Sequence, residues 1–113
     1  MLQFIGNQPV SNNTKTYSNS AHATIAVSVT AVDAIAARSD RKRLIIINRS
    51  VNTLYVATGT VASKPATAAN AEIEIPGQYA YEFSAVPTTA INFLWASKST
   101  PDSRAEALIT ENW

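Results

Sequence analysis

Apolar residues recur at every second position in several short stretches of this chain, and turn-forming residues separate the stretches. Residues 23–30 and 90–96 show the pattern clearly. A period of two is typical of a strand with one buried face, whereas a helix would place its apolar residues three and four apart. Together with the short continuous apolar run 44–47, which also suits a strand, about seven strands are expected. They predict an all-β fold, a small antiparallel β-sandwich or barrel.

The expected strands span residues 23–30, 44–48, 53–58, 72–75, 78–83, 90–96 and 104–110. Residues 31–37 fit either a helical turn or a strand. Pro76-Gly77 predicts a tight turn in which the glycine supplies a positive φ. The expected core consists of Ile25, Val27, Val29, Leu44, Ile45, Ile47, Leu54, Val56, Ile73, Ile75, Phe83, Ile91, Phe93 and Trp95. Tyr79 and Tyr81 share a face with Phe83 and are expected to pack there, rather than to form a sugar-binding platform.

Residues 1–22 differ from the rest of the chain, because they are rich in Asn, Ser and Thr and show no sustained periodicity. Such a segment cannot bury enough apolar area by itself to offset the entropy of ordering it. Its larger apolar and aromatic residues are Phe4, Ile5, Val10 and Tyr17. Spaced anchors in an extended polar segment are the pattern that strand addition uses. We therefore divide the chain into an extended N-terminal arm, residues 1–22, and a β-sandwich domain, residues 23–113.

The composition excludes several kinds of site. The chain has no cysteine and a single histidine, His22, so a disulfide scaffold, a cysteine-based metal site and a multi-histidine site are excluded. Glu72 and Glu74 share a strand face, where they are expected to oppose basic residues or face solvent. The net charge of +1 gives no general attraction to nucleic acid or membrane. No run of apolar residues is long enough to span a bilayer. We expect no enzymatic activity, no metal and no cofactor.

The strongest charge feature is a basic cluster that precedes the apolar run 44–47. Its members are Arg38, Arg41, Lys42 and Arg43. Three interpretations remain open. The cluster is a solvated loop that protects the apolar strand from aggregation, a surface that docks on an acidic patch of a neighbouring protein, or a phosphate-binding site. Trp113 has no strand after it and is expected to be loose or buried in a neighbour. These residues and the four arm anchors are the candidate partner-binding residues.

The order of several segments resembles small β-sandwich proteins from the virions of tailed bacteriophages. The segments are Arg41-Lys42-Arg43-Leu44-Ile45-Ile46-Ile47-Asn48-Arg49-Ser50, Asn52-Thr53-Leu54-Tyr55-Val56-Ala57 and Ile73-Glu74-Ile75-Pro76-Gly77-Gln78. The resemblance covers roughly residues 23–97. It rests on a basic residue before an apolar strand that ends in Asn, a "Leu-Tyr-Val" strand and an apolar Pro-Gly turn.

The resemblance implies a structural role on the capsid surface, with synthesis in the host cytoplasm. A capsid decoration or cement protein clamps adjacent capsid subunits, often as a trimer and through an extended terminal arm. Its expected partners are the major capsid protein and copies of itself. Only 15% of the residues are charged, less than the roughly 25% usual in soluble domains, which suits a surface covered by partners. The alternative is a receptor- or carbohydrate-binding module of a tail fibre or spike.

Overall fold

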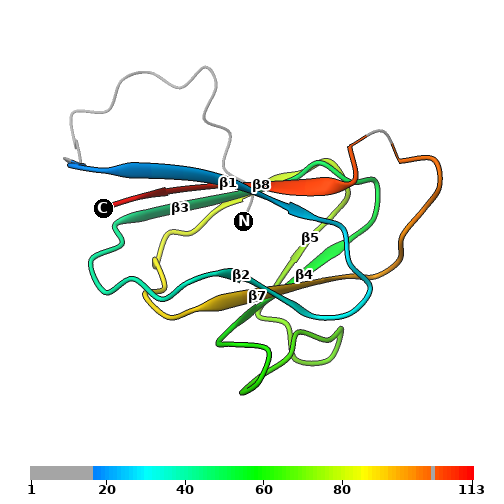
Figure 1. Ribbon diagram of the computed structural model, residues 1–113, viewed down its shortest axis with the longest axis horizontal. Coiled ribbons are helices and arrows are strands. Elements are labelled where there is room, and N and C mark those ends of the chain that lie inside the picture. The colour runs from blue at the N-terminus through cyan, green and yellow to red at the C-terminus, as the bar shows by residue number, and fades with distance from the viewer. Residues whose placement is uncertain (1–16, 103) are drawn as a thin grey trace.

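The computed structural model describes residues 17–102 and 104–113, which fold into two antiparallel sheets packed face to face (Figure 1). The described residues form eight strands, β1 (Ser20–Ala26), β2 (Val32–Ile35), β3 (Arg43–Asn48), β4 (Leu54–Thr58), β5 (Ile73–Ile75), β6 (Ala80–Glu82), β7 (Ile91–Trp95) and β8 (Glu106–Asn112). One sheet has the strand order β1-β8-β3-β6 and the other β2-β7-β4-β5. No helix occurs in the described residues. The predicted all-β fold is confirmed.

The hydrophobic core lies between the two sheets. Leu44 and Ile46 enter it from β3, while Val56, Phe93 and Trp95 enter it from β4 and β7, and none of the five is more than 1% exposed. The ring of Phe93 meets that of Trp95 edge to face, with centroids 5.8 Å apart. Burying one such side chain contributes roughly 1.5–3 kcal/mol to stability. Packing between the sheets therefore holds the sandwich together.

Two of the core predictions, Val29 and Ile47, are wrong. Val29 lies beyond the end of β1 and is 54% exposed. In β3, Leu44 and Ile46 point into the core, so Ile45 and Ile47 project from the other face of the sheet, where Ile45 is buried and Ile47 half-buried. Four consecutive apolar residues contain no alternation, and their sequence cannot reveal which pair faces inward.

The turn between β5 and β6 forms where it was expected, but its glycine has a different role. The residue with positive φ is Gln78, at 65°, and not Gly77. Gly77 passes so close to Val51 that a Cβ there would lie 2.2 Å from the Val51 carbonyl oxygen. The turn thus requires glycine for space. Tyr79 follows and is 50% exposed, so the expectation that it packs in the core is wrong.

The region around β1 and β2 also differs from expectation. β1 begins at Ser20, so Ser20, Ala21 and His22, which we assigned to the arm, pair with β8. Small alanine side chains hid this part of the strand pattern. Residues 31–37, which fitted either a helical turn or a strand, contain strand β2, which pairs with β7.

The strand register defines two ends of the sandwich. The loops after β1, β3 and β5 lie at one end, which we name the apolar end. It carries the three large hydrophobic residues that are most exposed among the described residues, Val29, Val51 and Tyr79. At the opposite end, Ser20, Arg43 and Asn112 lie side by side on β1, β3 and β8. The chain enters β1 here, and we name this the root end.

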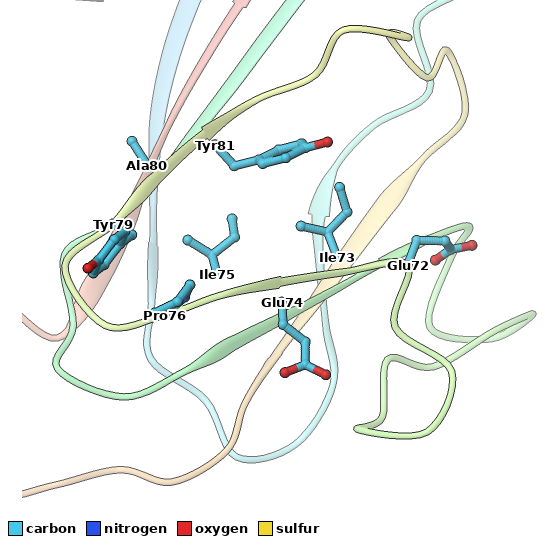
Figure 2. Close-up of a pocket in the computed structure, with 8 residues that line it drawn as sticks. All are labelled: Glu72, Ile73, Glu74, Ile75, Pro76, Tyr79, Ala80 and Tyr81. Carbon is cyan, nitrogen blue, oxygen red and sulfur yellow. The ribbon is translucent and has the colours of Figure 1, made fainter. Parts of the chain in front are cut away.

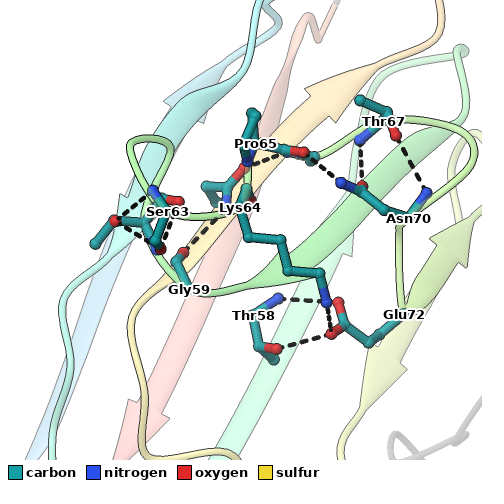
Figure 3. Close-up of polar contacts among 11 residues, drawn as sticks. Thr58, Gly59, Ser63, Lys64, Pro65, Thr67, Asn70 and Glu72 are labelled. Atoms are coloured by element: carbon teal, nitrogen blue, oxygen red, sulfur yellow. Dashed lines mark hydrogen bonds and ion pairs between the residues drawn. The ribbon is translucent and has the colours of Figure 1, made fainter.

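Buried Asn92 on β7 fixes the loop between β4 and β5. Its side-chain oxygen accepts a hydrogen bond from the backbone N–H of Ala66 at 2.7 Å. Its amide donates to the carbonyls of Gly59 and Lys64, both at 2.9 Å. Asn92 therefore holds the long loop 59–71 from the interior. Hydrogen bonds within the loop, such as those between Thr67 and Asn70, add to this (Figure 3).

Glu72 closes the same loop from its surface side. The carboxylate accepts hydrogen bonds from the Thr58 backbone N–H at 3.0 Å and the Thr58 hydroxyl at 2.8 Å, and it pairs with Lys64 (Figure 3). Burial alone would raise the pKa of Glu72, but these bonds outweigh it and lower the pKa to about 2. As expected for this carboxylate, Glu72 faces a basic residue.

Candidate functional site

Six of the nine candidate partner-binding residues lie in the described part of the chain. Phe4, Ile5 and Val10 fall outside the described residues. The remaining candidates are Tyr17, Arg38, Arg41, Lys42, Arg43 and Trp113. The last five gather at the root end, where Trp113 meets the basic cluster although it lies 70 or more positions away in sequence. Tyr17, which is half-buried, directly precedes the two residues that are tied to Trp113.

Backbone hydrogen bonds attach the start of the described chain to Trp113. The N–H groups of Ser18 and Asn19 both donate to the Trp113 carbonyl, at 2.9 and 2.8 Å. The Trp113 N–H donates in return to the Asn19 carbonyl at 3.1 Å. The start of the described chain is therefore held firmly at the end of β8.

Trp113 itself packs against its own chain. The guanidinium carbon of Arg38 lies 3.4 Å from the centroid of the Trp113 ring, a cation–π contact worth about 0.5–2 kcal/mol. The expectation that this tryptophan is loose is wrong, and its contact with a neighbour stays a prediction. Arg38 also reaches Glu111 at 3.4 Å, so it joins the attachment point of the arm to β8.

Arg41 is the most deeply buried member of the basic cluster, at 4% exposed. Its Nε donates to Glu111 at 2.8 Å, and its two terminal nitrogens donate to the carbonyls of Ala36, Pro87 and Thr89 at 2.6–3.2 Å. The guanidinium thereby joins two loops to β8. Because it is enclosed, it has no access to a partner, and the prediction that Arg41 contacts one is corrected.

Glu111 is the residue of this site that sequence reasoning missed. It accepts from Arg41 and Arg38, and these bonds outweigh the effect of burial, which would raise its pKa, so that the pKa lies below the ordinary glutamate value. The sequence did contain a signal for Glu111. It is an even number of positions from the inward-facing Ala107 and Ile109, so its side chain points to the same face of β8. A carboxylate at an inward position needs a cation or hydrogen-bond donors.

The other two members of the cluster lie nearer the surface. Arg43 pairs with Glu82 of β6 at 3.3 Å, and both side chains are partly exposed. Lys42 is exposed, and its backbone N–H donates to the Asn112 carbonyl at 2.8 Å. Arg38, Arg41 and Arg43 thus bind carboxylates of their own chain. The interpretation of the cluster as a solvated loop does not fit this arrangement.

Features outside the root end add little to the choice of function. Among the described residues, no group of His, Cys, Asp or Glu side chains could hold a metal ion, and no helix is long and apolar enough to cross a membrane. Comparisons with models of protein families, with curated proteins and with solved structures found no match.

The Glu111 site predicts a defined response to acid. Its carboxylate has a lower pKa in the folded protein than in the unfolded chain. Its contribution is therefore fully present above pH ~4.5 and is lost as pH falls through the folded pKa. As the pH is lowered from 5, the free energy of unfolding should fall less for E111Q than for the wild type. Urea denaturation at each pH measures this difference. Parallel curves for the two proteins would contradict this prediction.

Proposed function

We propose that this protein is a virion structural protein of a tailed bacteriophage, specifically a capsid decoration protein. In this role it links neighbouring capsid subunits through its N-terminal arm. Its partners are the major capsid protein and further copies of itself on the capsid surface. The sequence resemblance suggests this function, and the geometry of the root end supports it.

The observation that carries the proposal is the attachment of Ser18 and Asn19 to Trp113, which is itself packed on Arg38. A clamp works only if force on its arm reaches the body. Three backbone hydrogen bonds connect the base of the arm to Trp113, the residue that follows β8, the strand between β1 and β3, and the cation–π contact with Arg38 holds the Trp113 ring. The residues at the base of an arm with apolar anchors are thereby bonded to the body of the sandwich.

The apolar end provides a second contact surface. Val29, Val51 and Tyr79 are each about half exposed and lie on three loops at the same end. Exposed apolar residues gathered on one surface mark sites of protein contact more often than isolated ones do. In the proposed arrangement the apolar end rests on the capsid protein, while the arm reaches a neighbour.

Removal of residues 1–16 tests this function directly. The truncated chain keeps Tyr17 and all of β1, so we expect it to fold with an unchanged unfolding midpoint. When added to phage capsids prepared without the protein, it should occupy few sites, since binding to many subunits depends on the linked contacts. Occupancy is measured by quantitative gel analysis of purified particles.

A matched pair of full-length variants separates the anchors from the mere length of the arm. Replacing Phe4, Ile5 and Val10 with serine should reduce occupancy as the truncation does. Replacing Asn12 and Asn13 with serine should leave it unchanged. Full occupancy by the truncated chain would falsify the proposal.

A carbohydrate-binding module of a tail fibre or spike is the second candidate. Tyr79 is half exposed beside a groove that also contains Tyr81, and aromatic rings of this kind stack on sugars. Calorimetric titration with host surface polysaccharide distinguishes the two functions. The decoration function predicts no saturable heat, whereas a saturable signal that is lost in Tyr79→Ala would establish the alternative.

A further inference from the structure

A groove of about 280 Å³ runs along one edge of the sandwich, between β5 and β6. Figure 2 shows Ile73 and Ile75 pointing from β5 toward Tyr81 on β6, while Glu74 points the opposite way. The floor of the groove is therefore apolar, and it lies at the border of the hydrophobic core, against which Ile73 and Tyr81 pack.

Each strand that borders the groove lies at the edge of its sheet. β5 pairs only with β4, and β6 only with β3, among the strands of the described chain. An edge strand presents backbone N–H and C=O groups that can pair with an added strand. Addition of an extended segment beside β5 would continue the sheet and cover the apolar floor at the same time.

The side chains of β5 specify what such a segment should contain. Neighbouring residues of an added strand point alternately into the groove and away from it. Inward residues would meet Ile73 and Ile75, which favours apolar groups. Outward residues would lie beside Glu74, whose carboxylate has no ion pair or hydrogen bond to other described residues. A neutral or basic group suits that position, since like charges on adjacent strands repel.

The arm of the same protein has this chemistry. Residues 1–16 contain no acidic side chain, and their only charged one is Lys15. In an extended segment Phe4 and Val10 would share one face and Lys15 would lie on the opposite one. Sixteen extended residues reach roughly 50 Å, far enough to cross from one small domain to the next.

We propose that residues 1–16 of one copy add as a strand beside β5 in the groove of a second copy. This inference rests on the proposed function and deepens it by naming the arm's partner. Each copy would give its arm to one neighbour and receive an arm from another. Such a head-to-tail contact closes into a ring where the rotation between copies permits it.

The absence of cysteine from the whole chain allows a clean test by disulfide trapping. Glu74→Cys is mixed with full-length chains that carry cysteine in the arm at Ser11 or Asn13, which would point outward beside Glu74. The matched control is Asn12→Cys, which would point into the groove. A further control is Thr24→Cys, an exposed position on β1 at the other edge of the same sandwich.

We expect E74C to form a disulfide-linked heterodimer with S11C or N13C at a yield roughly tenfold above that with N12C or T24C, because cysteines with Cα atoms more than about 7 Å apart cannot be bridged. No heterodimer, or equal yields from all four partners, would overturn the proposal. So would a disulfide that forms within single chains of the E74C/N13C double variant. Unfolding midpoints of the single variants verify that each one folds.

This mixture contains no capsid, so its outcome is independent of the occupancy experiment. If no disulfide forms but truncation still lowers capsid occupancy, the proposed binding of the arm in the groove is wrong, while the decoration function is supported. If the disulfide forms but the truncated chain still occupies capsids fully, the exchange of arms between copies is supported and the proposed capsid role is wrong.

Discussion

Replacement of Arg41 by methionine is expected to lower the free energy of unfolding by about 3–5 kcal/mol, because it removes one partner of a buried ion pair. The Arg41 side chain is fully buried and donates to Glu111 and to three backbone carbonyls. Methionine fills a similar volume but donates nothing. Glu111 would then lose its shortest hydrogen bond, and the carbonyls of Ala36 and Pro87 would lose their Arg41 donor.

Urea denaturation at neutral pH measures this effect, and Arg43→Met is the matched control. Arg43 belongs to the same basic cluster, but its ion pair with Glu82 is 3.3 Å long and partly exposed. A pair of that kind contributes about 1 kcal/mol or less. If R41M and R43M destabilise the protein equally, the four cations are equivalent surface charges and the assignment of Arg41 to the interior is wrong.

Replacement of Asn48 by alanine is the second large effect, also expected to cost about 3–5 kcal/mol, because several buried polar groups lose partners together. Asn48 is fully buried. Its amide donates to the carbonyls of Asn52, Ile75 and Pro76 at 2.8–3.2 Å. Its side-chain oxygen accepts the indole N–H of Trp95 at 3.1 Å. One side chain thus ties the end of β3 to the β5–β6 turn and to the central tryptophan.

Asn52→Ala is the control for this network. The Asn52 side chain bonds the hydroxyls of Ser97 and Ser99 in an exposed setting, so its loss should cost about 1 kcal/mol or less. Hydrogen exchange of the Trp95 indole N–H provides a second readout, which should accelerate in N48A and not in N52A. Unchanged exchange together with a small loss of stability in N48A would show that the amide does not hold the tryptophan.

The candidate site could be predicted in part. The basic cluster and Trp113 stood out in the sequence because charge and terminal position are visible there. Their contacts were not visible, since Arg38 and Trp113 are 75 positions apart and meet only through the pairing of β8 with its neighbours. Strand parity indicated an inward position for Glu111, but only the fold shows that Arg41 lies opposite. The β5–β6 groove depends on two edges from different sheets, which no local pattern reveals.

Alternation of apolar residues and the turn-forming residues between strands determined, from the sequence alone, that the described chain is all-β and where most strands lie. These are local properties, set by which way successive side chains point. The tertiary structure decided which face of β3 is inside, why Gly77 must be glycine and which cation is buried. Each of those depends on the distance between residues remote in sequence, and that distance exists only once the two sheets have packed.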